Sequence, residues 1–229
     1  MTGKEAQIKL TAEEQAFRAF NRDTYNNGRL KEAYEQAAEF FARNPGSLYA
    51  KYAYAVMAGD YSEDKSLPET KRRELLGQAR QKIKEVCEHR DLDRWELATG
   101  ARNEYYWFHA LHEEQYRLGE ARVAAGEKRG YYSMCVGASS MARKCLREGK
   151  AAEAKAWAAK AVEAFKEFEK LDPAWFNINP FYAWALAILG DRAGALAAYR
   201  DMYRKQNAAI NDAEVAGFSA EIQKALNGE

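Results

Sequence analysis

The chain has 229 residues, of which 47% are hydrophobic and 30% charged, and its formal net charge is +1. This length and composition suit one large domain or one elongated array of repeats, and they argue against global disorder. A net charge so close to zero provides no overall field that would recruit nucleic acid or a membrane surface.

The prolines and cysteines narrow the fold class further. Four prolines in a chain of this length are typical of long helices and disfavour a fold with many strands. Cys87, Cys135 and Cys145 are odd in number and lack CxxC spacing, which argues against a disulfide framework or a zinc knuckle. Residues 1–5 lead into polar sequence, and the longest apolar run, 181–189, is too short to span a bilayer. We therefore expect a cytoplasmic protein without a membrane partner.

Helix start and stop signals divide the first third of the chain. Thr11 and Glu14 form a predicted capping box for a helix over 12–27, and Gly28 ends this helix because glycine tolerates the left-handed backbone. Similar signals predict two further helices over 29–43 and 47–59, a polar loop over 60–66, and a helix over 68–89 that begins at Pro68.

The remaining sequence also reads as helical. Asp93 and Glu96 indicate a second capping box, which predicts one long helical stretch from there to Gly126. Asn179 is the predicted N-cap of a helix whose first turn contains Pro180. The helices expected after Gly126 cover 131–147, 150–171, 180–189, 192–206 and 212–226. About ten helices with short connections predict an all-α fold.

Three places in the sequence share one pattern, in which a glycine at a helix–helix turn is followed five residues later by an alanine. The glycine permits a tight turn, and the alanine lets the second helix approach the first closely. The pairs are Gly28 and Ala33, Gly149 and Ala154, and Gly190 and Ala195. Antiparallel helix pairs with small residues at the crossing are typical of helical solenoids.

At these positions the chain resembles the tetratricopeptide-repeat family. The best copy begins after Pro173, and its separations fit the family's order of helix-A alanine, apolar residue, turn glycine, helix-B alanine and aromatic residue. The residues that fit are Ala183, Leu186, Gly190, Ala195 and Tyr199. In the first copy, Gly28 and Ala33 fit the second half of a repeat, whereas Asn21 stands where a small residue is usual.

The resemblance implies antiparallel helix pairs stacked as an α–α superhelix, in a single domain over 1–229. The repeats are clearer at 12–60 and 149–207, and the middle, 61–148, is divergent with an insertion in its first loop. The helix over 212–226 is expected to cap the array, because a solenoid must cover its last apolar face.

The resemblance also implies a ligand-binding groove lined by the first helix of each pair. It assigns to that groove Gln15, Arg18, Arg22, Tyr25, Asn26, Tyr49, Tyr52, Val56, Asn177, Pro180 and Trp184. Arg18 and Arg22 are four residues apart, so both can point the same way and bind a carboxylate. The expected partner is another protein or a peptide with an acidic or C-terminal carboxylate group. An exposed polar face on a terminal helix is the alternative, because the Lys and Asn set of the clamp-type members is not reproduced.

A second candidate surface is basic. Between residues 71 and 84 the chain carries six cations against one acid, Glu74. The cations are Lys71, Arg72, Arg73, Arg80, Lys82 and Lys84. Such a face could bind nucleic acid or an acidic partner, whereas the alternative is a solvated outer helix face relieved by neighbouring glutamates.

Residues with catalytic or metal-binding chemistry form no convincing pattern. His109 and His112 lie three apart beside Glu113 and Glu114, but no separate third ligand cluster appears, and histidines in an aromatic-rich helix are more typical of packing. Neither a GxSxG turn nor a phosphate-binding loop is present. The sequence therefore predicts a non-enzymatic binding scaffold without a metal or cofactor. The second hypothesis is a regulatory subunit that contacts nucleic acid or an acidic partner through 71–84.

Overall fold

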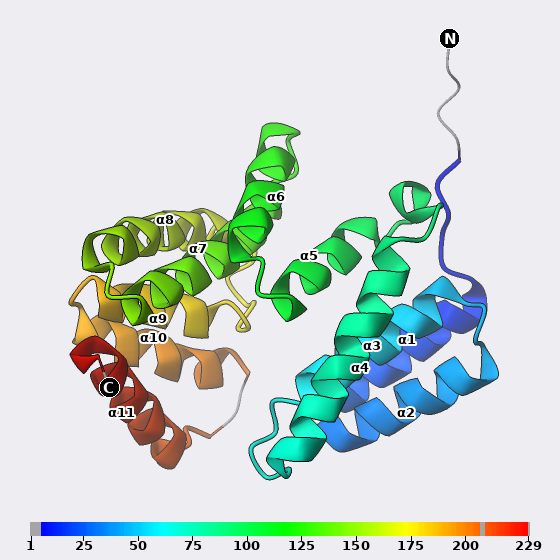
Figure 1. Ribbon diagram of the computed structural model, residues 1–229, viewed down its shortest axis with the longest axis horizontal. Helices are drawn as coiled ribbons and strands as arrows, with labels where there is room; N and C mark the ends of the chain where they lie inside the picture. The colour runs from blue at the N-terminus through cyan, green and yellow to red at the C-terminus, as the bar shows by residue number, and fades with distance from the viewer. Residues whose placement is uncertain (1–5, 207–208, 229) are drawn as a thin grey trace. The chain divides into compact units, whose positions relative to one another are not determined.

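The computed structural model describes residues 6–206 and 209–228, and the regular secondary structure of these residues is entirely helical (Figure 1). This confirms the predicted all-α class. The chain divides into two compact units, Met1–Ala110 and Leu111–Glu229. The boundary falls inside the segment 61–148, so a single array that continues through both units stays a prediction. Residues 1–5 and residue 207, at the end of the predicted repeat 149–207, lie outside the described residues.

In the first unit each helix packs on the next one along the chain, from α1 to α5. Its helices are α1 (Ala12–Asn26), α2 (Leu30–Arg43), α3 (Leu48–Tyr61), α4 (Glu69–Cys87), a 3-10 turn (Leu92–Arg94) and α5 (Ala98–Phe108). In addition, α3 contacts both α1 and α5. Contacts between every second helix, added to those between neighbours, are the arrangement expected for stacked helix pairs.

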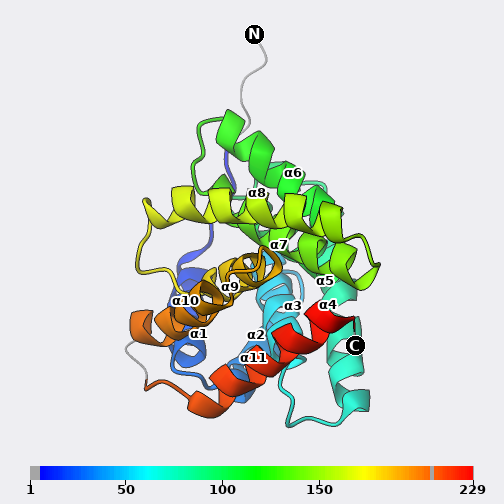
Figure 2. The same cartoon turned by 90° about the vertical axis from the view of Figure 1, so that its left-hand side faces the viewer.

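The second unit follows the same scheme, and Figure 2 shows α9 and α10 lying between the α7–α8 pair and α11. Its helices are α6 (His112–Ala124), α7 (Gly130–Arg147), α8 (Ala151–Glu169), α9 (Asn179–Ile188), α10 (Arg192–Lys205) and α11 (Asp212–Asn227). Here α9 contacts both α7 and α11. None of the helices among the described residues has a stretch long and apolar enough to cross a membrane.

The three glycine–alanine turns adopt one backbone geometry. Gly28, Gly149 and Gly190 have φ values of 75°, 73° and 97°, in the left-handed region that favours glycine. After each glycine, the next N–H reaches back to a carbonyl five residues earlier, at 3.2, 2.9 and 2.9 Å. This is the Schellman pattern, which satisfies carbonyls at the end of the first helix.

The alanine of each pair is completely buried, as the pattern predicts: Ala33, Ala154 and Ala195 each have 0% exposure. Asn21 occupies the place that Ala183 holds in the last copy, and it too is buried. Its side-chain amide donates to the carbonyl of Ala33 at 2.7 Å and to Gln36 at 3.2 Å. A polar residue is therefore tolerated here because both of its amide hydrogens find partners on α2.

The prediction of one long helix from the capping box at Asp93 and Glu96 to Gly126 is wrong, because two helices, α5 and α6, occupy this stretch. The first turn of the predicted helix does not form, because Glu96 accepts a hydrogen bond from the Leu10 amide and the helix begins only at Ala98. It is then interrupted at Ala110, which has φ of 56°. Ala110 takes the place of the turn glycine and Gln115, five residues on and 1% exposed, takes the place of the buried alanine. The turn therefore forms here although both the glycine and the alanine that predict it elsewhere are replaced.

Replacing Ala110 with glycine should stabilise the protein. A left-handed conformation costs an L-residue roughly 1–2 kcal/mol, of which glycine recovers part after its larger loss of backbone entropy. We expect a gain of about 0.5–1 kcal/mol in the free energy of unfolding, measured by urea denaturation. Ala121→Gly, at an exposed position inside α6, is the control and should cost about 1 kcal/mol. Equal losses from both substitutions would contradict the strain assigned to Ala110.

Asn179 is not the N-cap of α9, which corrects another expectation. Ile178 holds that position, and Pro180 lies in the first turn as predicted. The Asn179 side chain is 1% exposed and donates to the carbonyl of Ala198 at 3.0 Å and to Asp201 at 3.2 Å. It joins α9 to α10 because buried amide groups require such partners.

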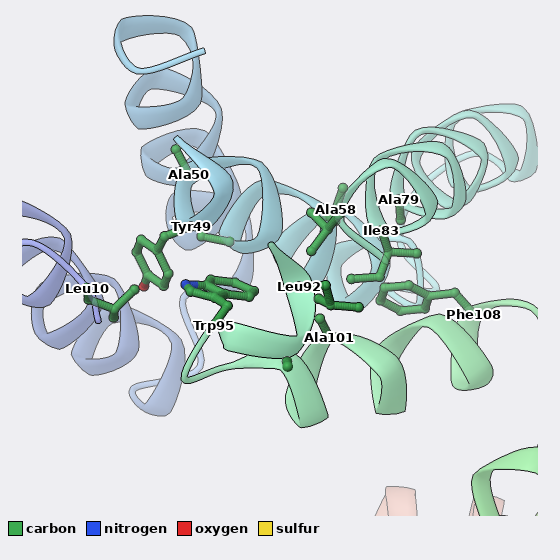
Figure 3. Packing of buried hydrophobic residues seen from close by; sticks show 14 of the residues in the cluster. Leu10, Tyr49, Ala50, Ala58, Ala79, Ile83, Leu92, Trp95, Ala101 and Phe108 are labelled. Carbon is green, nitrogen blue, oxygen red and sulfur yellow. The ribbon is translucent and has the colours of Figure 1, made fainter. Parts of the chain in front are cut away.

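The core of the first unit lies between α3, α4, α5 and the segment before α1 (Figure 3). Leu10 and Trp95 are 5% and 4% exposed and lie near Tyr49. The backbone of Ile8 forms hydrogen bonds to Arg94 and Glu96 on both sides of Trp95. Residues 6–10 are thus held against the α4–α5 connection, a long-range contact that no local pattern predicts.

The closest helix contact of the second unit joins α6 and α7. A Cβ atom at Gly137 would lie 2.6 Å from the carbonyl oxygen of His112 and 2.7 Å from the amide nitrogen of Tyr116. The glycine therefore allows backbone to meet backbone.

The last helix, α11, has one buried side, formed by Val215, Phe218 and Ile222. Phe218 stacks on Tyr199 of α10 at 4.1 Å between ring centroids and meets Trp184 of α9 edge-on at 5.7 Å. The other side of α11 is exposed. This pattern matches the predicted capping helix over 212–226.

Candidate functional site

Three helices of the first unit, α1, α3 and α5, run in the same direction, and their contacts define a common face. Arg18 of α1 lies close enough to Tyr52 of α3 for its charge to lower the pKa of that phenol, against a larger increase due to burial. The hydroxyl of Tyr52 lies over Gly100, where a Cβ atom would be 3.2 Å away. Arg18, Tyr52 and Gly100 thus form one end of this face, which we call the Arg18 end.

The other end holds two carboxylates. Tyr25 of α1 hydrogen-bonds the side chain of Asp60 near the end of α3, and Glu104 of α5 interacts electrostatically with Asp60. Each of these residues lies further along its own helix than its counterpart at the Arg18 end, which is why the three helices must be parallel. We call Tyr25, Asp60 and Glu104 the carboxylate end, and both ends together, with Arg22 and Val56, the α1/α3/α5 face.

Burial dominates the electrostatics of the carboxylate end. It raises the pKa of Asp60 from 3.8 to about 7, with a further increase from Glu63 and a smaller decrease from the Tyr25 hydrogen bond. It raises the pKa of Glu104 from 4.5 to about 8, helped by the charge of Asp60. Both side chains nevertheless retain partial exposure. They are surrounded by protein yet in contact with solvent, a setting in which perturbed carboxylates are found at functional sites.

No compensating charge relieves either carboxylate. Among the described residues, neither Asp60 nor Glu104 forms an ion pair within 4.0 Å. At the other end Arg18 is exposed and Arg22 is exposed one helical turn later, and likewise no ion pair within the described part of the chain involves them. Arginines and carboxyl groups without ion-pair partners therefore remain available on the α1/α3/α5 face, and a cationic ligand would favour the ionised form of the carboxyl groups.

The residues that the sequence assigns to the groove are distributed unevenly. Arg18, Arg22, Tyr25, Tyr52 and Val56 all belong to the α1/α3/α5 face. Gln15 and Asn26 are exposed on α1, and the Gln15 amide donates to the carbonyl of Leu10 at 3.0 Å.

Four of the assigned residues do not join this face, and one of them, Pro180, lies in the first turn of α9 in the second unit. Tyr49 is 5% exposed and packs on Phe17, and burial raises its pKa to about 12. Asn177 and Trp184 belong to the second unit, where Trp184 is 5% exposed beneath Phe218 and the guanidinium of Arg143, 4.4 Å from its ring. A partner could reach only the edges of Tyr49 and Trp184, so we do not count these two residues among those that bind it.

Sequence reasoning missed Asp60 and Glu104. Asp60 was expected in a loop over 60–66, but α3 continues through Tyr61 and so carries Asp60 on the side of Val56. The spacing of Tyr52, Val56 and Asp60, four residues apart, was the available signal. Glu104 lies in the segment predicted as one long helix and follows Gly100 by the same interval.

The basic stretch on α4 is largely neutralised by its neighbours. Lys71, Arg73, Lys82 and Lys84 pair with Glu74, Glu69, Glu85 and Glu88 respectively. Arg72 and Arg80 donate to the carbonyls of Ser62 and Phe108, at 2.9 and 2.6 Å. These contacts favour a solvated outer face over a nucleic-acid surface.

His109, His112 and the three cysteines lie in packed surroundings, whereas His89 is exposed beside Asp91. The ring of His109 lies 4.4 Å from that of Tyr105, and burial lowers the pKa of His112 to about 4. Burial also raises the pKa of Cys87 to about 11, so that its thiol is protonated at neutral pH. Within the described residues no group of three or more His, Cys, Asp or Glu side chains could hold a metal ion.

Comparison of the chain with protein-family models, with curated proteins and with solved structures finds no match.

Proposed function

We propose that this protein is a non-enzymatic scaffold that binds another protein or a peptide through the α1/α3/α5 face. The observation that carries the proposal is the presence, on one face built from three parallel helices, of two arginines and two carboxyl groups without ion-pair partners. Burial favours the protonated form of Asp60 and Glu104, and a cationic group of a ligand would offset the cost of ionising them. The proposal includes the resemblance to tetratricopeptide repeats, which the three identical glycine turns support, and a cytoplasmic location.

The composition of the face also supports a peptide ligand. Tyr25 and Tyr52 are half-buried and present both an aromatic surface and a hydroxyl group. Tyrosine and arginine contribute much of the energy of protein interfaces. Arg18 and Arg22 together supply a fork that fits an acidic side chain or a C-terminal carboxylate.

The substitutions Arg18→Glu and Arg22→Glu, made together, should abolish capture of the native partner. Both side chains are exposed, so the helical circular dichroism should be unchanged. The measurement is affinity purification from the native host followed by mass spectrometry, with wild type and variant side by side. Lys155→Glu with Arg200→Glu, which reverses two exposed charges of the second unit, is the matched control. Unchanged capture by the Arg18 and Arg22 variant would reject this face as the binding surface.

A further inference from the structure

The two ends of the α1/α3/α5 face differ in charge and are separated by a fixed length of helix. From Tyr52 to Asp60 is eight residues of α3, or about 12 Å at 1.5 Å per residue. From Arg18 to Tyr25 is seven residues of α1, or about 10 Å. α1 and α3 thus place the two ends about 11 Å apart, whereas the four residues of α5 from Gly100 to Glu104 place them about 6 Å apart.

An extended peptide advances about 3.3 Å per residue, so separations of about 6 to 11 Å correspond to about two to four residues. Val56 and Arg22 lie between the two ends, where the backbone of such a peptide would run. The carboxylate end has two carboxyl groups, those of Asp60 on α3 and Glu104 on α5. Two carboxylates converging from different helices match a guanidinium or ammonium group, which has several N–H donors.

We infer that the α1/α3/α5 face binds an extended peptide segment with one basic side chain, an arginine or lysine, held by Asp60 and Glu104, and one acidic group held by Arg18 about two to four residues away. This inference rests on the proposed function and specifies the ligand. It also explains why the face carries carboxylates at all, since a purely acidic ligand would be repelled from that end.

The test uses an immobilised library of serine- and glycine-based peptides, acetylated and amidated at their ends. Each peptide carries one arginine and one glutamate at separations that vary across the library, and matched peptides have glutamine in place of either. Wild-type protein should bind best at a separation of about two to four residues and more weakly at longer separations. Replacing either charged residue of the peptide should weaken binding roughly tenfold, as for one desolvated ion pair.

Protein variants assign each end of the peptide to its site. Asp60→Asn with Glu104→Gln should remove the preference for arginine over glutamine and retain the preference for glutamate. Arg18→Gln should do the reverse. Both are neutral substitutions of similar shape, and circular dichroism would verify that each variant is folded.

Several results would overturn the inference. These are an arginine preference that survives the double carboxylate substitution, a binding optimum independent of the separation, or no binding of any library peptide to wild type. If the native partner is still lost by the Arg18 and Arg22 variant, any of these results leaves the proposed function standing. If that variant captures the partner normally, the proposed function itself fails.

Discussion

Gly137→Ala should destabilise the second unit by about 3 kcal/mol, in spite of the better helix propensity of alanine. The added methyl group would lie 2.6 Å from the carbonyl oxygen of His112 and 2.7 Å from the amide of Tyr116. These are backbone atoms of α6, which cannot rotate away as a side chain does. Relief requires α6 and α7 to separate along their contact, which opens the core beneath them.

Gly217→Ala in α11 is the control for this prediction. Gly217 is exposed inside a helix, and no atom lies within 4 Å of a Cβ built there. Alanine at this site should raise the free energy of unfolding by about 0.5–1 kcal/mol. Urea denaturation followed by circular dichroism measures both. A Gly137→Ala protein as stable as wild type would show that α6 and α7 pack less closely than described.

Replacing the carboxylate pair by amides should stabilise the first unit, by an amount that grows as the pH rises from about 4 to about 8. The native state holds protons on Asp60 up to about pH 7 and on Glu104 up to about pH 8, whereas the unfolded chain loses them near the ordinary values of 3.8 and 4.5. Across this window the unfolded state binds fewer protons, so the stability of wild type falls as the pH rises.

Asp60→Asn with Glu104→Gln removes this ionisation. We expect little difference from wild type at pH 4 and a gain of about 2 kcal/mol at pH 9, a value reduced from the full linkage because both side chains are partly exposed. Urea unfolding curves at several pH values provide the measurement, with Glu163→Gln on the exposed side of α8 as the control. Should wild type and variant show parallel pH profiles, the carboxylates are not desolvated as described.

Most helices could be predicted from the sequence because their ends carry recognisable chemistry. Thr11 and Glu14 do form both hydrogen bonds of a capping box, at 2.8 and 3.2 Å. A glycine at a predicted helix–helix turn indicates a left-handed backbone conformation, because few other residues adopt it. Ala110 adopts the same conformation without being a glycine. For that reason the sequence predicts one helix where the chain has two.

The candidate site was only half predictable for a different reason. Arg18, Arg22 and Tyr25 lie on one helix, so local spacing places them together. Asp60 and Glu104 are 44 residues apart in sequence and meet only because α3 and α5 pack side by side. A rule that reads one helix at a time cannot bring them together, nor can it show that their charges lack partners.

The buried amide of Asn21 has a consequence for how such an array can be rearranged. The α9–α10 pair has a buried amide of the same kind, because Asn179 donates to the carbonyl of Ala198 and to Asp201. The Asn21 amide requires a second helix that places a backbone carbonyl and an amide oxygen opposite it, as Ala33 and Gln36 do. Duplication or recombination that exchanged α1 for another first helix would leave those groups unmatched. We therefore expect α1 with α2, and α9 with α10, to stay together when helices are exchanged.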